Sequence, residues 1–207
     1  MKVETALLSD NERMLSYQLL ADCYYLPDEK LLRRLCDLGE SVGGSFLKVI
    51  KHIPIGEELK VLAVDFSRLF VGPFKLLAPP YGSVYLENSR TIMSGSTIDV
   101  RNSYQQEGLR IDLKEAPDHI AIELEFMYFL IFRRAQAIKN SDSQSAGRYL
   151  KKQASFLEAH LGRWISEFTD KVVANSQTLF YRKLAQATRL FIQDDLKNIY
   201  HIRTHPI

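Results

Sequence analysis

EAPDHIAIELEFM, residues 115–127, joins a short polar turn to a strongly apolar helical pattern. Beyond the turn, apolar residues recur three or four places apart, at Ile120, Leu124, Met127 and Ile131. This spacing is typical of one face of an α-helix. Phe126, Phe129 and Leu130 widen that face, so we expect a central helix that is buried over much of its circumference.

The polar turn before this helix has one structural interpretation. Pro117 suits the first turn of a helix, where its missing N–H would lack a partner in any case. Asp118 could then complement the helix dipole and accept a backbone N–H, while His119 bonds across to the preceding loop. The turn would in that case be a structural or recognition corner between two helices.

Two other interpretations give the same residues a chemical role. Asp118 and His119 could form an acid–base pair, but neighbours on a helix point roughly 100° apart and do not readily bond each other. His119 and Glu123 are four residues apart and share a helix face, as metal ligands on helices often do. A di-iron bundle, however, uses Glu-x-x-His motifs, and this sequence contains none. We therefore expect no metal, no cofactor and no catalytic residue, and keep an enzyme that uses His119 as the alternative.

Helical spacing also predicts helices on both sides of this stretch. Ser9 and Glu12 have the S-x-x-E form of a capping box before the first helix, which Pro27 ends, and Asp28 can cap the second. The remaining helices are expected at 46–52, 57–71, 98–107, 148–169 and 176–196, with a loop at 140–147. Because no convincing alternating strand pattern occurs, we predict an all-α helical bundle that forms a single domain over residues 1–207.

Residues 72–95 interrupt the helical spacing with three prolines and three glycines. A stretch of this length without regular structure is uncommon inside a compact domain and is often functional. Tyr81 and Tyr85 lie in it, and their hydroxyl groups need water or a polar partner. We expect an ordered loop that takes part in recognition.

The composition argues against several classes of protein. Of the 207 residues 46% are hydrophobic and 25% charged, and the net charge of +2 gives no dense basic stripe for nucleic acid. The sequence has no signal peptide and no apolar run near the roughly 18 residues that span a bilayer, so we expect a cytoplasmic protein without stable membrane insertion. It also lacks GxSxG, P-loop and Rossmann motifs. Cys23 and Cys36 match no redox or zinc pattern and are expected in the core.

Three stretches of the sequence carry a family resemblance. They are FSRLFVGP with PPYGSVY (66–85), EAPDHIAIELEFM (115–127), and FLEAHLGRWISEF with FYRKLAQATRLFI (156–192). Together they resemble the TorD/DmsD/NarJ family of cytoplasmic chaperones, which mature molybdenum-cofactor oxidoreductases of the dimethyl sulfoxide reductase type. The family pattern usually reads Glu-Pro-any-Asp-His. Pro117 stands one place later here, whereas Asp118 and His119 keep the family's register.

The resemblance implies a fold and a function. It implies an N-terminal helical portion at about 1–110, a hinge at about 111–119 and a C-terminal portion at about 120–207. It further implies a chaperone, not an enzyme, that binds the twin-arginine signal peptide and the apo form of the catalytic subunit of a molybdoenzyme, assists cofactor insertion and delays Tat export. Some members form domain-exchanged dimers, which makes a homodimer an expectation here. Guanine-nucleotide binding is proposed for some members, but nothing in this sequence independently indicates it.

The implied ligand sets the candidate site. A twin-arginine peptide offers two guanidinium groups and an apolar segment, so its receptor needs carboxylates beside an apolar groove. We prefer Glu123 to Glu125 as an acceptor because Glu123 shares the face of His119. The expected peptide-binding residues are Phe66, Leu69, Phe70, Tyr81, Tyr85, Glu115, Pro117, Asp118, His119 and Glu123. A helical scaffold for some other partner is the remaining alternative.

Overall fold

The computed structural model describes residues 9–41, 58–72, 75–87, 95–110 and 115–204. Its elements are α1 (Asp10–Cys23), α2 (Glu29–Ser41), α4 (Leu59–Phe66), the π-helical turn η1 (Ser67–Val71), α5 (Gly82–Leu86), α6 (Gly95–Gln105), α7 (Ile120–Lys139), α8 (Ser143–Ala159), α9 (Leu161–Asn175) and α10 (Leu179–Thr204). No strand is formed by the residues described, apart from a single isolated bridge. The all-α prediction is therefore confirmed. The helix predicted at 46–52 lies outside the described residues.

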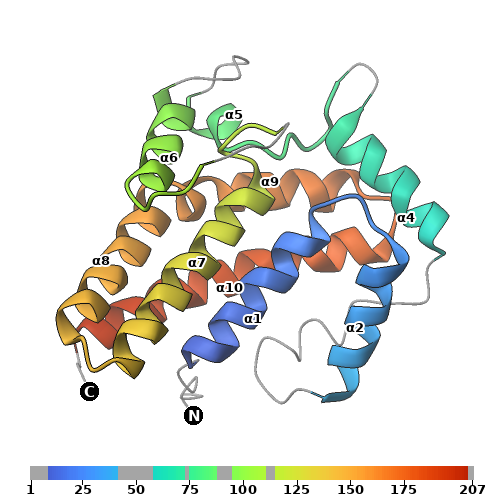
Figure 1. Cartoon of the computed structure of the whole chain (residues 1–207). Coiled ribbons are helices and arrows are strands. Elements are labelled where there is room, and N and C mark those ends of the chain that lie inside the picture. Colours follow the sequence, from blue (N-terminus) through green and yellow to red (C-terminus); the bar gives the residue numbers. More distant parts are fainter. Residues whose placement is uncertain (1–8, 42–57, 73–74, 88–94, 111–114, 205–207) are drawn as a thin grey trace, which may run out of the picture.

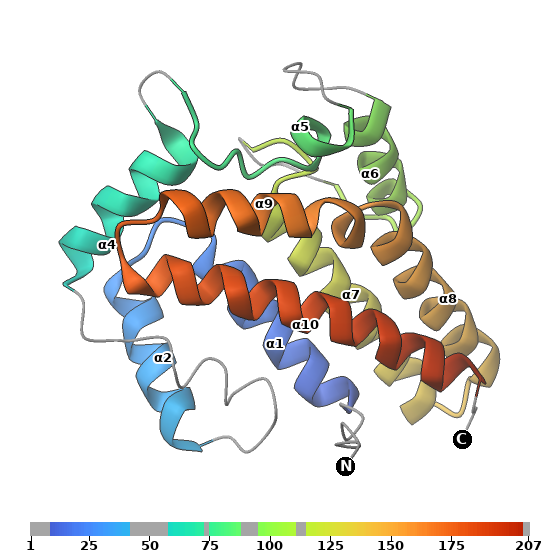
Figure 2. The same ribbon diagram turned by 180° about the vertical axis from the view of Figure 1, so that it is seen from behind.

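The long helices form two layers. In Figure 1, α7 lies between α1 and α8, and α9 and α10 run behind them. Figure 2 shows α10 crossing the whole molecule beside α9, which makes this pair the second layer. Helices α5 and α6 cover the end of the bundle where α7 begins, and α2 and α4 lie at the opposite side from α8. The region where α7 starts is therefore where several separate segments meet.

Helix α7 is central, as its sequence pattern predicts. Ile120, Leu124, Met127 and Ile131 are all fully buried. The core around them is rich in large aromatic side chains, including Tyr17, Tyr24, Tyr104, Trp164 and Tyr181. Burial of such side chains supplies most of the driving force for packing helices together.

Capping residues fix the starts of α1 and α2, as predicted. The backbone N–H of Ser9 donates to Glu12 at 2.8 Å, and the Ser9 hydroxyl accepts from the Glu12 N–H, which completes the capping box of α1. Asp28 accepts from the N–H of Leu31 at 2.8 Å at the start of α2. Both helices thus begin where local side chains satisfy backbone donors.

The predicted helix at 148–169 is in fact two helices that meet at His160. The backbone of His160 is not helical, with φ −125° and ψ −102°. A side chain at Gly162 would place its Cβ 2.5 Å from the carbonyl oxygen of Leu157, so only glycine allows this tight approach. The apolar spacing continues across the break, and for that reason the periodicity does not reveal it. Helix α8 also begins earlier than predicted, because the Asp142 carboxylate caps it by accepting from the N–H of Ser145 at 2.9 Å.

Two buried polar contacts tie distant segments of the bundle together. The Asp65 carboxylate on α4 accepts from the N–H groups of Gln177 and Thr178, at 3.0 and 2.8 Å, just before α10. On the other side of the core, Arg13 of α1 donates to Asp195 of α10 at 2.6 Å, and both side chains are fully buried. These contacts set the position of α10 against α4 and α1.

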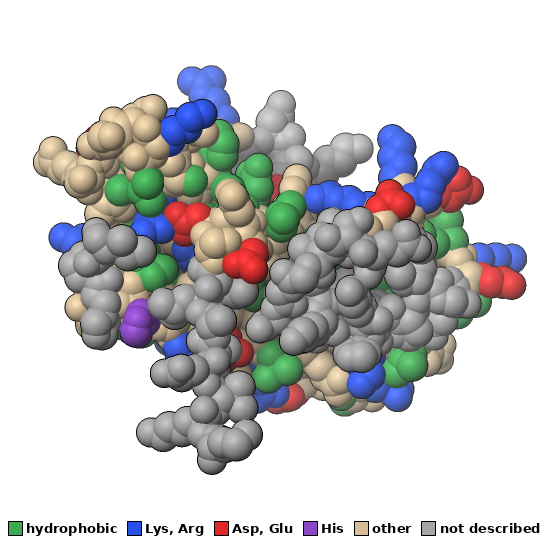
Figure 3. All heavy atoms as spheres, turned by 90° about the horizontal axis from the view of Figure 1, so that it is seen from below, with side chains coloured by type: hydrophobic (Ala, Val, Ile, Leu, Met, Phe, Trp, Pro, Cys, Tyr) green, Lys and Arg blue, Asp and Glu red, His purple; other side chains and the backbone are tan. Residues whose placement is uncertain are grey.

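The charged groups of the described surface are mixed in sign. Figure 3 shows Lys and Arg side chains close to Asp and Glu side chains on the face seen from below. Among the described helices, none is long and apolar enough to cross a membrane. Cys23 is buried in the core, as predicted.

Candidate functional site

The Pro/Gly-rich loop and the polar turn before α7 pair with each other through their backbones. The N–H of Gly82 donates to the carbonyl of Asp118 at 2.9 Å, and the N–H of Ile120 donates to the carbonyl of Pro80 at 2.8 Å. This pairing forms an isolated antiparallel bridge between Tyr81 and His119. Two of the stretches that carry the family resemblance, which are far apart in sequence, are thus joined at the start of α7.

Asp118 and His119 exchange the roles that the sequence predicts for them. His119 is the N-cap of α7, and its Nδ1 accepts from the N–H of Ala121 at 3.2 Å. Asp118 instead reaches across to the loop and accepts from the N–H of Ser83 at 2.8 Å. The reason is that α7 starts at Ile120, later than expected, which moves the capping position from Asp118 to His119.

Pro117 does not lie in the first turn of the helix, so that prediction is wrong. It precedes the His119 cap by two residues, and its carbonyl accepts from the buried hydroxyl of Tyr104 at 2.9 Å. Pro117 therefore helps to attach α6 to the turn before α7.

The environment of His119 keeps its imidazole neutral. Burial lowers the pKa of His119 to about 4, and the charges of Glu115 and Asp118 only partly oppose this shift. A neutral imidazole has one nitrogen without a proton, and here that nitrogen accepts the Ala121 N–H. His119 is thus used as a structural cap. Among the described residues, no group of three His, Cys, Asp or Glu side chains is placed to hold a metal ion.

Glu123, the preferred acceptor, lies in the interior. Its Oε2 accepts from the indole N–H of Trp164 at 3.2 Å, and the side chain has no exposed surface. Burial raises the pKa of Glu123 well above its usual value, and the hydrogen bond from Trp164 only partly opposes this shift. Gly82 packs directly on this pair: a Cβ there would lie 2.8 Å from Nε1 of Trp164 and 3.2 Å from Oε1 of Glu123. Glu123 therefore fixes the loop and faces no open surface in this structure.

An aromatic and acidic surface surrounds His119. The ring of Tyr25 stacks on the imidazole at 6.2 Å, and the ring of Tyr81 meets it edge-on at 5.4 Å. Tyr25 donates its hydroxyl to Glu125 at 3.0 Å, and Tyr81 donates its hydroxyl to Glu115 at 2.8 Å. Both carboxylates are exposed, and both tyrosines are partly exposed. We name Tyr25, Tyr81, Glu115 and Glu125 the acidic rim.

The acidic rim borders a hollow whose lining is partly apolar and partly charged. Burial and the neighbouring carboxylates raise the pKa values of Tyr25 and Tyr81, so both hydroxyl groups keep their protons. A hollow of about 270 Å³ adjoins Tyr25, and Leu26 and Leu31 contribute its apolar lining. Asp22, paired with Arg34, also lines this hollow. Negative charge and apolar surface therefore occur side by side.

The residues expected to form the walls of a groove lie in the core instead. Phe66, Leu69, Phe70 and Tyr85 are all at most 8% exposed. Phe70 packs against Phe168 and Tyr181, and Tyr85 stacks on Trp164 at 5.6 Å. Of the ten predicted residues, the structure thus brings only Tyr81 and Glu115 to the surface beside the His119 cap.

Sequence reasoning missed Tyr25, which comes from the end of α1. Its signal was present in the Tyr24-Tyr25 pair just before Pro27, where the helical pattern ends. Tyr24 is buried in the core at 2% exposure, whereas Tyr25 has left the helix and turns toward α7. Two adjacent tyrosines at a helix end must face different directions, so one of them was available for the surface.

The comparisons with known proteins agree with this fold. The family profile described as Nitrate reductase delta subunit matches residues 46–170. A solved structure from Archaeoglobus fulgidus, described as a candidate redox enzyme maturation protein, superposes with a TM-score of 0.60 over 92% of this chain and 99% of that one, at 24% identity. This likeness concerns the fold.

Similar sequences come from several bacteria. The chaperone protein TorD of Vibrio parahaemolyticus is 29% identical over 136 residues, which are 65% of this chain and 62% of that protein. The perchlorate reductase assembly chaperone protein of Dechloromonas aromatica is 30% identical over 142 residues, with 65% and 62% covered. The Tat proofreading chaperone DmsD of Salmonella paratyphi A is 29% identical over 127 residues, with 60% and 55% covered.

The chain spans about three fifths of the length of these curated relatives. The profile match covers more than half of the chain and includes both segments that pair at the start of α7. The motifs that resemble TorD, DmsD and NarJ proteins lie in the same region or extend it toward the C-terminus. The chain therefore belongs to the family that this profile describes as Nitrate reductase delta subunit, which is the TorD/DmsD/NarJ family.

Proposed function

We propose that this protein is a cytoplasmic chaperone that binds the twin-arginine signal peptide and the apo form of a molybdenum-cofactor oxidoreductase of the dimethyl sulfoxide reductase type. It would assist cofactor insertion and delay export by the Tat system. The observation that carries the proposal is the acidic rim, in which two exposed tyrosine–carboxylate pairs flank the buried His119 cap. The names of the relatives, an assembly chaperone and a Tat proofreading chaperone among them, support the same class of function.

The acidic rim offers what a pair of guanidinium groups requires. A carboxylate can accept two parallel N–H bonds from one arginine, which a lysine ammonium cannot supply. Glu115 and Glu125 are each bonded to a different tyrosine beside His119, so each can take one arginine. The faces of Tyr25 and Tyr81 add cation–π attraction beside each carboxylate. Each tyrosine hydroxyl already holds its carboxylate in place, which lowers the entropy lost on binding.

The apolar segment of a signal peptide would continue into the neighbouring hollow. Leu26 is 62% exposed there and offers an apolar contact. Tyr25 belongs to both the acidic rim and this hollow. A peptide whose arginines contact the acidic rim would therefore place its following apolar residues on Leu26.

Asp118 and Glu123 act on the peptide indirectly in this proposal. Asp118 holds the loop through the Ser83 N–H, and the hydrogen-bonded pair of Glu123 and Trp164 packs against Gly82 of the same loop, which carries Tyr81. The direct acceptors are thus Glu115 and Glu125, in place of Glu123. We retain Asp118, His119 and Glu123 as residues that position the acidic rim.

Calorimetric titration with a synthetic twin-arginine signal peptide tests the proposal. The wild-type protein is expected to bind it at least about tenfold more tightly than the same peptide with Lys-Lys. Glu115→Gln and Glu125→Gln should each weaken binding, and the double variant should lose the preference for arginine. Glu158→Gln is a matched control, because Glu158 accepts from the Tyr200 hydroxyl in a similar exposed pair on α8 and α10. Equal affinity for both peptides would exclude this function.

A further inference from the structure

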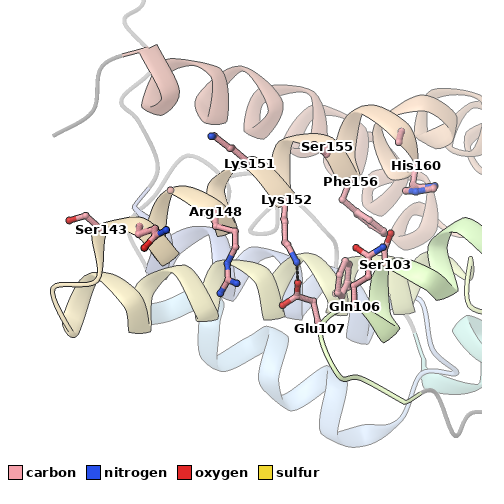
Figure 4. A pocket seen from close by; sticks show the side chains of 14 residues that line it. Ser103, Gln106, Glu107, Ser143, Arg148, Lys151, Lys152, Ser155, Phe156 and His160 are labelled. Carbon is pink, nitrogen blue, oxygen red and sulfur yellow. Dashed lines mark hydrogen bonds and ion pairs between the residues drawn. The ribbon is translucent and has the colours of Figure 1, made fainter.

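A second surface hollow, of about 820 Å³, lies between α6 and α8. In Figure 4 the side chains of Arg148, Lys152 and Phe156 extend from α8 toward residues of α6 and its C-terminal end. Phe126 of α7 contributes to the lining and packs edge-on against Phe156 at 4.8 Å. We name this hollow the α6–α8 groove. None of the four residues of the acidic rim lines it.

The charged lining of the α6–α8 groove is mainly basic. Arg148, Lys151 and Lys152 oppose a single acidic residue, Glu107. Lys152 and Glu107 pair with each other, as the dashed line in Figure 4 shows. Arg148 and Lys151 are exposed, and neither is in an ion pair with any carboxylate of the described chain. Two cations at the edge of the groove are therefore available to a ligand.

The nearest carboxylates outside the lining are already in use. Asp142 attracts Arg148, but it caps α8, and its hydrogen bonds to the backbone of Ser145 are the main cause of its lowered pKa. Asp99 lies near the other end of the groove, where its charge acts on His160. The groove thus keeps an excess of positive charge along α8.

His160 gives the groove a buried polar group without a partner. Its side chain is 6% exposed, its Nδ1 has no hydrogen-bond partner, and it lines the groove at the break between α8 and α9. Burial lowers its pKa, so the imidazole is neutral at pH 7. A neutral imidazole can accept from an N–H or donate to a carbonyl, and a peptide backbone provides both. Nδ1 of His160 is one of several buried side-chain atoms of the described residues without a partner, and it is the one whose side chain lines this groove.

The dimensions of the groove match a short extended peptide. Its lining along α8 runs from Ser143 to His160, which corresponds to about 25 Å of helix at 1.5 Å per residue. An extended chain of about seven residues covers this length. Arg148, Lys151 and Lys152 lie within about 6 Å along α8, and Phe126, Phe156 and His160 extend the lining beyond them, so the charged part of a ligand would occupy only part of the groove.

We propose that the α6–α8 groove binds an acidic peptide segment of a partner protein in extended form. Arg148 and Lys151 face its carboxylates, Phe126 and Phe156 contact one of its apolar side chains, and His160 bonds its backbone. The groove is opposite in charge to the acidic rim and shares no residue with it. A single partner could therefore present a basic segment to one surface and an acidic segment to the other.

Fluorescence anisotropy with a labelled synthetic peptide, Asp-Glu-Phe-Asp-Glu-Leu-Asp-Glu, tests this proposal on the full chain. The wild-type protein should bind it, and an otherwise identical peptide with Asn and Gln should bind about tenfold more weakly or not at all. Arg148→Glu and Lys151→Glu should together weaken binding of the acidic peptide by about tenfold or more, because attraction becomes repulsion. Added salt should weaken it further.

Two control variants show whether the loss of affinity is specific to the α6–α8 groove. Lys60→Glu reverses an exposed charge on α4, on the other side of the molecule, and should leave the affinity unchanged. Glu115→Gln with Glu125→Gln should also leave it unchanged, so a failure of the acidic rim would not affect this test. Equal binding by the Arg148→Glu, Lys151→Glu double variant and the wild type would refute the proposal. So would displacement of the peptide by inorganic phosphate at the same molar concentration, which would identify a site for small anions instead.

Discussion

His119 and Glu123 should give the folded protein two opposing pH dependences, which substitutions can separate. His119→Asn keeps a cap, because the Asn side-chain oxygen can accept the Ala121 N–H, but it removes the titrating group. Glu123→Gln keeps the size of the side chain and an acceptor for the Trp164 indole, and it likewise does not titrate. The two residues are buried, at 6% and 0% exposure, so solvent screens their shifts little.

His119 and Glu123 contribute to the pH dependence of the free energy of unfolding with opposite signs. The folded pKa of His119 is about 4, below its ordinary value of 6.5. Between these values the unfolded chain holds a proton that the folded chain lacks, so the free energy of unfolding rises with pH by up to about 1.4 kcal/mol per unit, or about 3 kcal/mol in total. The folded pKa of Glu123 is instead raised well above 4.5. Above pH 4.5 the folded chain therefore keeps a proton that the unfolded chain has lost, and this contribution falls with pH at a similar slope.

In the wild type the two slopes oppose each other above pH 4.5. Urea unfolding followed by circular dichroism across this range measures the free energy of unfolding of each variant. Relative to wild type, His119→Asn should lose about 1 kcal/mol per pH unit as pH rises between pH 4.5 and 6.5, and Glu123→Gln should gain free energy of unfolding as pH rises above 4.5. The double variant should combine the two changes. All other titrating groups are common to the four proteins. If the difference between His119→Asn and wild type is constant with pH, the assignment of a neutral, buried imidazole is wrong.

Two other substitutions test how the bundle supports the site. Gly82→Ala should lower the free energy of unfolding by about 1–3 kcal/mol, because the new Cβ would lie 2.8 Å from Nε1 of Trp164. Urea unfolding measures this change, and unchanged stability would show that the loop is free to move away. Asp65→Ala should cost about 2–3 kcal/mol, because the Thr178 N–H and hydroxyl each lose a charged acceptor at 2.8 Å. Glu58→Ala, at the exposed start of α4 where no side-chain cap is formed, should change stability by less than about 0.5 kcal/mol.

Much of the fold could be predicted from local patterns. The capping box at Ser9 and the apolar face of α7 both depend on residues within a few positions of one another, and both are confirmed. Local patterns predict a helix boundary poorly where tertiary contacts determine it. The break at His160 requires the close approach of Gly162 to the carbonyl of Leu157, and the continuous apolar spacing does not indicate it.

The site could be predicted only in part, because burial of polar residues depends on which segments meet. Spacing correctly separates Glu123 and Glu125 onto different faces of α7, but it does not say which face is covered. The indole of Trp164, 41 residues away, selects Glu123 for the interior. The Tyr25 hydroxyl then holds Glu125 at the surface from 100 residues away. Both partners are long-range, so no local pattern identifies the exposed carboxylate.

The division between buried and exposed carboxylates predicts two kinds of loss in peptide binding. A change at Glu123 or Gly82 disturbs the loop that carries Tyr81, and this lowers the fraction of molecules with an intact acidic rim. The affinity for every peptide then falls by the same factor. A change at Glu115 or Glu125 removes an acceptor with the geometry for a guanidinium group, so it lowers the affinity for Arg-Arg more than for Lys-Lys. The ratio of the two affinities therefore distinguishes a residue that contacts the peptide from one that positions the site, even when both variants bind the twin-arginine peptide equally weakly.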